Sequence, residues 1–376
     1  MNINLTNSEA MKLNILCVEI PTMFSVGELL RVSLIGEYAG DPDEGMKNVM
    51  HCLTKELSKH HEIMQLSIED AKYRVFRDPR ISFLSPNFLA KIKKFQPQVI
   101  HYIPFSGLTF FCFMRAKVIA HYARNAKIVI SCLQPPRDYS YLSKKMISTL
   151  KPDLILVQSR KTTRILKNLG MRTRFLPNGV DIKKFIPVSE KTKEKMRKKY
   201  ELDNRFIILH VGHINNARNV RILGDLAEGD DSVIIVGSTS TKADKDLIKY
   251  LKKKGGIVWL RYFENIHEIY GLSDCYIFPT IREFSSIEIP LSILEAMACN
   301  LPVISTRFGG LVDIIEEGDG FYFFNEFYEA KNKIEEVRNG VEVKTRKKVL
   351  PYSWENVISE LDKIYRELDS GRIYDA

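Results

Sequence analysis

The chain has 376 residues, of which 45% are apolar and 27% are charged, and its net charge at neutral pH is +10. This length exceeds what one ordinary hydrophobic core holds, so two domains are expected, and the composition is typical of a soluble globular protein. No apolar run approaches the ~18 residues that a membrane-spanning helix needs, and no nucleic-acid motif accompanies the positive charge. A transmembrane protein and a nucleic-acid-binding protein are therefore not expected.

Cysteine usage and the first residues point to a reducing compartment. No two of the six cysteines form a CxxC pair, so free thiols are expected rather than disulfides or a zinc site. The beginning of the chain lacks the basic head and the small-residue cleavage site of a signal peptide. These features predict a cytoplasmic protein.

In the first half of the chain, apolar strands alternate with amphipathic helices, which is typical of a parallel-sheet α/β domain. The expected strands are Leu13–Ile20, Met64–Ile68, Gln98–Ile103, Lys127–Cys132 and Leu154–Gln158. The expected helices are Met46–Lys59, Leu89–Lys94, Thr109–Ala123, Leu142–Leu150 and Lys161–Asn168.

The pattern breaks at Leu176–Pro187, which contains Pro, Asn and Gly and marks a domain boundary. A second α/β series follows. Its expected strands are Phe206–Val211, Val233–Val236, Ile257–Leu260, Cys275–Phe278 and Leu301–Ser305. Its expected helices are Glu190–Tyr200, Val220–Ala227, Lys242–Lys253, a short helix from Pro290, and a final helix over Ser353–Leu368.

Residues 281–310, IREFSSIEIPLSILEAMACNLPVISTRFGG, are the most informative segment. Pro290 suits the first turn of a helix, and apolar residues recur at helical spacing from Leu291 to Ala298. A helix that begins in a loop points N–H groups outward and attracts anions. Gly309 and Gly310 allow close approach of the backbone to a ligand. The layout predicts an α/β protein that binds phosphate at the edge of its sheet.

Within this segment, LEAMACNLPVIST followed by FGG resembles the donor-site signature of retaining glycosyltransferases of the GT-B fold, family 4. Residues 176–187 resemble the inter-domain segment of that family, and Ser353-Trp354-Glu355 resembles its C-terminal signature. The resemblance covers residues 150 to 370 well and the first 150 residues loosely. It implies two Rossmann-like parallel-sheet domains that face each other across a cleft, over residues 1–183 and 184–352, with residues 353–376 forming a helix that crosses back to the first domain.

The same resemblance implies a reaction. A nucleotide-diphosphate sugar would donate its sugar, with retained configuration, to a hydroxyl of a glycan, lipid or small-molecule acceptor. The family needs neither a metal nor another cofactor. A rival interpretation is a protein that binds nucleotide sugars without turnover, because some of the family's residues are displaced here.

Basic and hydroxyl groups would contact the diphosphate. His213 and Arg218 follow a strand at the carboxyl edge of the second sheet, where α/β sheets bind ligands, and they replace the arginine and lysine of the family. An arginine can hold phosphate with two donors. Ser286 and the backbone of Ile289 and Leu291 would add further donors.

The family's pair of glutamates is only partly present. Glu295 matches the second, which implies contact with the ribose hydroxyls. Ile287 stands where the first is expected. The neighbouring Glu288 is the preferred replacement as the group near the reacting carbon, and the alternatives are the more distant Glu283 or neither residue. Gly309 and Gly310 would approach the donor.

The first domain would supply the acceptor side. Gly45 stands where the family has a glycine-rich turn, and His101 matches a family histidine at a strand end that is a candidate catalytic group; a histidine packed in the core is the alternative. One of Gln134, Arg137 and Asp138 would line the acceptor pocket.

Two segments suggest contact with the inner face of a membrane. The aromatic run Thr109–Arg115 and the lysines that flank residues 146–150 could lie on anionic lipid, although core packing is the simpler explanation of the apolar residues.

Overall fold

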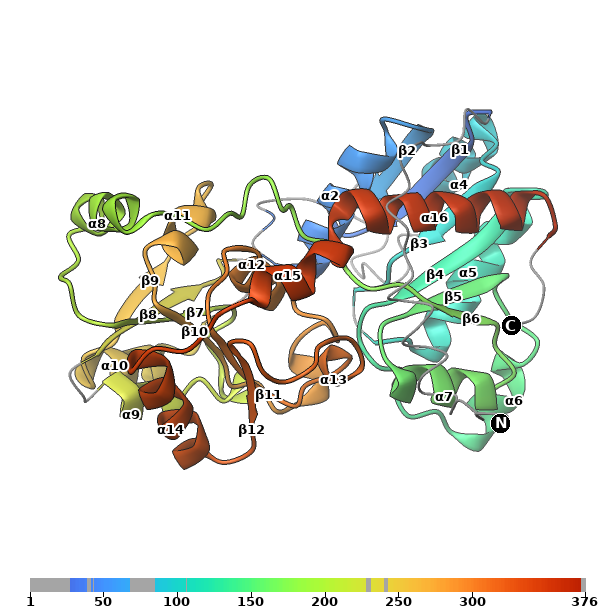
Figure 1. The fold of residues 1–376 in the computed structure, drawn as a ribbon. Coiled ribbons are helices and arrows are strands. Elements are labelled where there is room, and N and C mark those ends of the chain that lie inside the picture. The colour runs from blue at the N-terminus through green and yellow to red at the C-terminus, as the bar shows by residue number, and fades with distance from the viewer. Residues whose placement is uncertain are drawn as a thin grey trace, which may run out of the picture.

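The computed structural model describes residues 28–38, 42, 44–67, 85–105, 107–227, 231–239 and 243–372, which form two lobes joined by two crossings of the chain (Figure 1). Each lobe contains a six-stranded sheet in which all paired strands are parallel. Strands buried on both faces by helices carry near-continuous apolar runs. This is the pattern of β3 (Val99–Tyr102), β5 (Leu154–Val157), β8 (Ser232–Gly237) and β10 (Cys275–Phe278).

The N-terminal lobe has the strand order β2-β1-β3-β4-β5-β6. Its strands are β1 (Arg31–Gly36), β2 (Glu62–Ser67), β3 (Val99–Tyr102), β4 (Lys127–Cys132), β5 (Leu154–Val157) and β6 (Thr173–Phe175). Its helices are α2 (Gly45–Leu57), α4 (Pro86–Phe95), α5 (Phe110–Tyr122), α6 (Tyr141–Ile147) and α7 (Arg160–Asn168).

The C-terminal lobe has the strand order β12-β11-β10-β7-β8-β9. Its strands are β7 (Ile207–Val211), β8 (Ser232–Gly237), β9 (Ile257–Leu260), β10 (Cys275–Phe278), β11 (Val303–Thr306) and β12 (Phe321–Phe324). Its helical segments are α8 (Glu190–Lys199), η2 (Asn216–Arg218), α9 (Ile222–Ala227), α10 (Lys245–Lys253), α11 (Ile266–Gly271), η3 (Glu283–Ser285), α12 (Leu291–Ala298), α13 (Leu311–Ile314), α14 (Phe327–Arg338), α15 (Thr345–Val349) and η4 (Leu350–Tyr352). Read from β9, this is the order of a doubly wound Rossmann sheet, whose strand order reverses between β7 and β10.

The last helix, α16 (Trp354–Asp369), returns to the N-terminal lobe and lies beside α2 (Figure 1). Its buried residues, among them Leu361 and Tyr365, share one hydrophobic cluster with Leu34 and Met50 of that lobe. Val180 and Ser353 pair where the two crossings run side by side. The core of the first lobe is thus completed by the last helix of the chain.

Most expected elements are present with small shifts of their ends. The strand expected at Leu13–Ile20 lies outside the described residues, and the strand at Arg31–Gly36 was not expected. None of the helices within the described ranges is long and apolar enough to cross a membrane.

Candidate donor site at the edge of the second sheet

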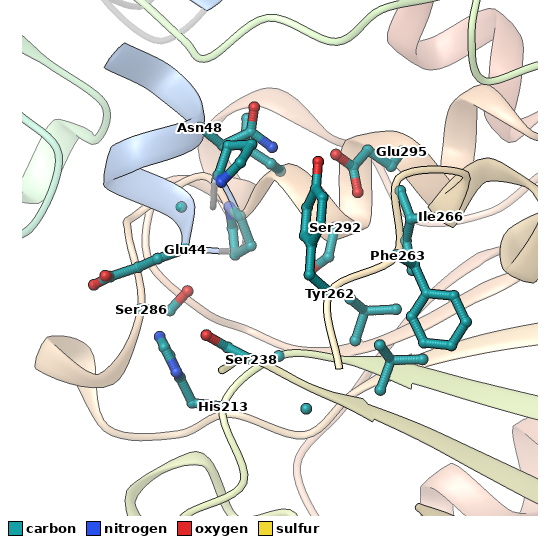
Figure 2. A pocket seen from close by; sticks show the side chains of 18 of the residues that line it. Glu44, Asn48, His213, Ser238, Tyr262, Phe263, Ile266, Ser286, Ser292 and Glu295 are labelled. Atoms are coloured by element: carbon teal, nitrogen blue, oxygen red, sulfur yellow. The ribbon is translucent and has the colours of Figure 1, made fainter. Parts of the chain in front are cut away.

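A pocket lies at the carboxyl end of the second sheet, at the point where its strand order reverses (Figure 2). Loops that follow β7, β8 and β9 form one wall, and the start of α12 forms another. The first turn of α2 from the N-terminal lobe closes the third side. Open α/β sheets bind ligands at such a reversal because adjacent loops diverge there and leave a crevice.

The helix α12 directs its N-terminus at this pocket. Pro290, Leu291 and Ser292 all line it, no side chain caps the helix, and its first turn contains no acidic residue. The first N–H groups of a helix have no partner inside the helix and carry partial positive charge. The buried hydroxyl of Tyr276 donates a hydrogen bond of 2.7 Å to the Ser292 hydroxyl and fixes its position. This end of the pocket therefore attracts anions.

Arg218 supplies a buried cation at the same place. The carboxamide of Asn215 accepts a hydrogen bond of 3.1 Å from the Arg218 backbone N–H and shapes the single turn η2 that carries it. Its Nε donates to the carbonyl of Ser285 at 2.8 Å. Burial lowers the pKa of the guanidinium to about 10, so it remains charged at neutral pH. His213, on the loop after β7, also lines the pocket (Figure 2).

Glu295 lies at the other end of the pocket, beside Phe263 and Ile266 (Figure 2). The hydroxyl of Tyr270 donates a hydrogen bond of 2.8 Å to its Oε2. Burial raises the pKa of the carboxyl to about 7, and the bond from Tyr270 opposes that rise. A carboxylate with one oxygen held in this way leaves the other oxygen for the hydroxyls of a ligand. The pocket thus runs from a partly apolar end with one carboxylate to an end with two basic side chains.

The N-terminal lobe contributes Glu44, Gly45 and Asn48 to the pocket. Gly45 is the first residue of α2, and a Cβ built there would come within 3.1 Å of the Ile287 side chain. A glycine therefore lets α2 pack closely on residues 286–291. Glu44 is the N-cap residue of α2, but its side chain makes no capping hydrogen bond and lies in the pocket instead.

The structure brings together half of the residues expected at the site, namely Gly45, His213, Arg218, Ser286, Leu291 and Glu295. It places the others elsewhere. His101 is fully buried, and its two ring nitrogens hydrogen-bond to Tyr365 at 2.6 Å and to Ser131 at 2.7 Å. Burial lowers its pKa to about 3, so the ring stays neutral as a link between β3 and α16. In this structure His101 has the packed position that was its alternative, and a catalytic role for it remains a prediction.

Glu288, the preferred replacement for the displaced first glutamate, is also absent from the pocket walls. Its side chain is 2% exposed and points into the seam between the lobes. Its Oε1 accepts hydrogen bonds from the hydroxyls of Ser159 and Thr162 in the N-terminal lobe, at 2.6 and 2.9 Å. The alternative, Glu283, is paired with Lys161 in the same seam. The pocket wall carries Ile287 at the family position of that glutamate.

The remaining expected residues also belong to the contact between the lobes. A Cβ at Gly309, whose φ is +52°, would lie 2.4 Å from the Glu288 carbonyl oxygen, and one at Gly310 would lie 1.8 Å from that of Gln158. The absence of a side chain at these two glycines thus allows the backbone of Glu288 and Gln158 to pack closely against them. Ile289 is fully buried, and the side-chain amide of Gln134 donates to the carbonyl of Phe284 at 3.3 Å. Donor contact through Ile289 and these glycines, and acceptor contact through Gln134, remain predictions.

Sequence reasoning missed several residues of the pocket wall: Asn48, Gly237, Ser238, Arg261, Tyr262, Phe263 and Ile266. Most of them follow β8 or β9. The carboxyl ends of parallel strands meet at one edge of a sheet, so the rule that selected His213 after β7 could have selected these residues as well. In the part of the chain that the structure describes, no three acidic, histidine or cysteine side chains are grouped so that they could hold a metal ion.

Comparison with known proteins agrees with this architecture. Residues 205–338 match the family model of the group 1 glycosyl transferases. A sulfoquinovosyl transferase of Arabidopsis thaliana is 24% identical over 261 residues, which are 64% of this chain and 49% of the plant protein. The chain spans about half the length of the curated relatives it matches.

Two solved structures share the fold over nearly the whole chain. The Anabaena protein HepE in complex with UDP-glucose aligns with a TM-score of 0.66 at 17% identity, over 90% of this chain and all of that one. A sucrose-phosphate synthase of Thermosynechococcus elongatus aligns with a TM-score of 0.69 at 16% identity, over 91% of this chain and all of that one. Residues 205–338 therefore match the group 1 glycosyl transferases, and the two lobes share the GT-B fold of these solved structures.

Proposed function

We propose that this protein transfers a sugar from a nucleotide-diphosphate sugar to an acceptor hydroxyl, with retention of the anomeric configuration. One observation carries the proposal: a buried, charged arginine and an uncapped helix N-terminus converge on the pocket at the strand-order reversal. The similar fold of HepE, whose structure contains UDP-glucose, supports a nucleotide sugar as the ligand.

The geometry suggests an orientation for the donor. The diphosphate would lie between Arg218 and the first turn of α12, and the ribose hydroxyls would meet Glu295. When the bond to the sugar breaks, negative charge grows on the departing diphosphate. A fixed cation and N–H groups aimed at that charge stabilise the transition state without reorganising. The acceptor would enter from the side of α2, next to Glu44 and Asn48.

A protein that binds nucleotide sugars without turnover is the second candidate. It is favoured by the apolar Ile287 on the pocket wall and by the position of Glu288 in the seam. The two candidates share the donor site and differ only in chemistry. The test adds glycan, lipid and small-molecule acceptors to the protein and its nucleotide sugar. Binding of the nucleotide sugar without release of free nucleotide diphosphate would favour this second candidate.

The donor site is tested by calorimetric titration of UDP, GDP and ADP and their glucose conjugates into wild type and Arg218→Ala. We expect one nucleotide series to bind wild type, and the variant to bind it at least about tenfold more weakly because charge-assisted bonds to phosphate contribute roughly 1.5–3 kcal/mol each. Arg221→Ala, which removes an arginine three residues away that lies over Tyr250, is the matched control. Equal affinities of wild type and Arg218→Ala would refute this placement of the diphosphate.

We further propose that the acceptor is presented at an anionic membrane surface. Large apolar side chains are exposed on the neighbouring helices α5 and α6, namely Phe111, Met114, Tyr141, Leu142 and Met146. Lys144 and Lys145 are exposed on α6 among them. Apolar side chains flanked by lysines suit the interface of an anionic bilayer.

A further inference from the structure

Residues 283–289, here called the bridging loop, connect β10 to α12 and run between the donor pocket and the N-terminal lobe. Ser286 and Ile287 line the pocket, and Ser285 accepts the hydrogen bond from Arg218. The loop therefore forms part of the donor site. Its shape decides where those groups lie.

Much of what holds the bridging loop comes from the other lobe. The backbone N–H of Glu288 donates to the carbonyl of Leu133 at 2.7 Å. The side-chain carbonyl of Gln158 accepts from the Ile289 N–H at 3.3 Å, and the amide of Asn178 donates to the Ile289 carbonyl at 2.7 Å. At the other end of the loop, Arg137 stacks over the ring of Phe284, 3.8 Å from its centroid. Three of these contacts are therefore made by residues of the N-terminal lobe, namely Leu133, Arg137 and Gln158.

The carboxylate of Glu288 lies at the centre of this contact, at the N-terminus of α7. Ser159 caps that helix by accepting from the Thr162 N–H at 3.0 Å, and the same hydroxyl donates to Glu288 Oε1. The second oxygen, Oε2, is buried and has no hydrogen-bond partner. A buried charged oxygen without a partner is costly, whereas a protonated, neutral carboxyl is much less so.

We propose that Glu288 is a positioning residue that couples the docking of the two lobes to donor binding through the bridging loop. The inference rests on the proposed donor site. It differs from the role of a sugar ligand because Glu288 acts on the pocket only through the loop that it anchors. Closing the seam shapes the loop, and opening the seam releases Ser285, Ser286 and Ile287 from their places at the donor.

The coupling depends on pH. Burial, together with the neighbouring carboxylates Glu283 and Asp313, raises the pKa of Glu288 from its usual 4.5 to about 7, and the hydrogen bonds from Ser159 and Thr162 oppose this rise. The other charged or titratable groups at this contact are Arg160 near Asp313, Lys161 paired with Glu283, and the thiol of Cys132. Because the pKa of Glu288 is raised in the closed seam, protonated Glu288 stabilises the closed seam fully below pH 4.5, and this stabilisation is lost as the pH rises through about 7.

The test compares wild type with Glu288→Gln, which keeps the acceptor oxygen for Ser159 and Thr162 but cannot ionise. Affinity for the nucleotide diphosphate is measured at pH 5.5 and 8.5. We expect the variant to bind more tightly than wild type by a factor that is small at pH 5.5 and grows to about tenfold at pH 8.5. This factor is well inside the limit set by the full pKa shift. Glu295 titrates in the same range, but it is present in both proteins, so the difference between them isolates Glu288.

Glu283→Gln is the matched control, because it neutralises another carboxylate of the same loop whose ion pair with Lys161 is exposed. Exposed ion pairs contribute little, and Glu283 is only a minor cause of the raised pKa of Glu288, so the affinity of Glu283→Gln should stay much closer to wild type than to Glu288→Gln at both pH values. Parallel pH dependence of wild type and Glu288→Gln would overturn the inference. So would an equal gain of affinity at pH 8.5 in Glu283→Gln.

Hydrogen exchange supplies a readout that needs no ligand. The amides of Glu288 and Ile289 are bonded to the other lobe, so at one fixed pH we expect faster exchange in Thr162→Val, which removes one donor to Glu288 and keeps the cap at Ser159. Unchanged exchange would overturn the coupling. If no nucleotide binds any of these proteins, the proposed function fails, and the exchange result still decides whether Glu288 holds the loop.

Discussion

At the first turn of α2, Glu44 places a carboxylate in the same pocket as the guanidinium of Arg218. Its charge favours the protonated form of that arginine. A diphosphate bound at Arg218 would bring further negative charge to the pocket. Glu44 therefore helps to hold the buried cation in the free protein and opposes the anion that the pocket is proposed to bind.

This opposition gives a prediction at the residue scale. Glu44→Gln should bind nucleotide diphosphate more tightly than wild type, by about three- to tenfold, because it removes a like charge near the phosphates. Glu56→Gln makes the same change of charge at the far end of α2, roughly 18 Å away, where salt screens it, and should bind as wild type does. Isothermal titration at low and moderate salt measures both. Weaker binding by Glu44→Gln would contradict the prediction.

The site residues that could be predicted are those whose position follows from a strand end or a helix start. His213 and Arg218 follow β7, and Ser286, Leu291 and Glu295 surround or form α12. The sequence pattern could not show on which side of the bridging loop a side chain would point. Glu288 and Ile287 are neighbours, yet one faces the seam and the other faces the pocket.

At the scale of elements, α16 joins the chain's end to the core of its first lobe. Leu361 is fully buried in the cluster that includes Leu34 of β1 and Met50 of α2. Tyr365 adds a polar anchor through its short hydrogen bond to the buried His101. Packing of this kind makes the helix part of the lobe rather than an appendage.

Leu361→Ala should lower the free energy of unfolding by about 2–5 kcal/mol, the usual cost of a cavity left by a buried leucine. Lys363→Ala, at an exposed position of the same helix, should change it by less than about 0.5 kcal/mol. Denaturant unfolding followed by tryptophan fluorescence, which comes from Trp259 and from Trp354 at the start of α16, measures both changes. Equal midpoints for Leu361→Ala and wild type would mean that α16 does not stabilise the lobe.

Much of the fold could be predicted because buried parallel strands and amphipathic helices have distinct periodicities. Strands such as β5 and β8 are continuous apolar runs and were expected within a residue or two of their ends. β6 has three residues, all half-buried, and α13 has four, so neither offers enough positions for a period to appear. β1 follows another apolar stretch closely, and local pattern alone did not select it.

At the scale of the whole molecule, the apolar side chains of α5 and α6 give the N-terminal lobe one face suited to lipid. We expect binding to vesicles with acidic headgroups and not to neutral vesicles, since the net charge of +10 favours the former. The double variant Tyr141→Ser, Leu142→Ser should lower the vesicle affinity about tenfold, because both side chains are largely exposed and would enter the interface.

Tyr328→Ser is the control for this experiment, because Tyr328 is also a largely exposed aromatic residue and lies on α14 in the other lobe. Sedimentation with vesicles at two salt concentrations measures binding. If the control loses as much affinity as the double variant, or if neither loses any, the face on α5 and α6 is not the one that meets lipid.

The path of the chain through the two lobes also has a consequence for its synthesis. The last helix lies in the core of the first lobe, and the entire second lobe is translated between them. A nascent polypeptide can therefore finish its second lobe while the first still exposes the apolar groove that α16 will fill. The half of the molecule that the ribosome makes first is the half that matures last.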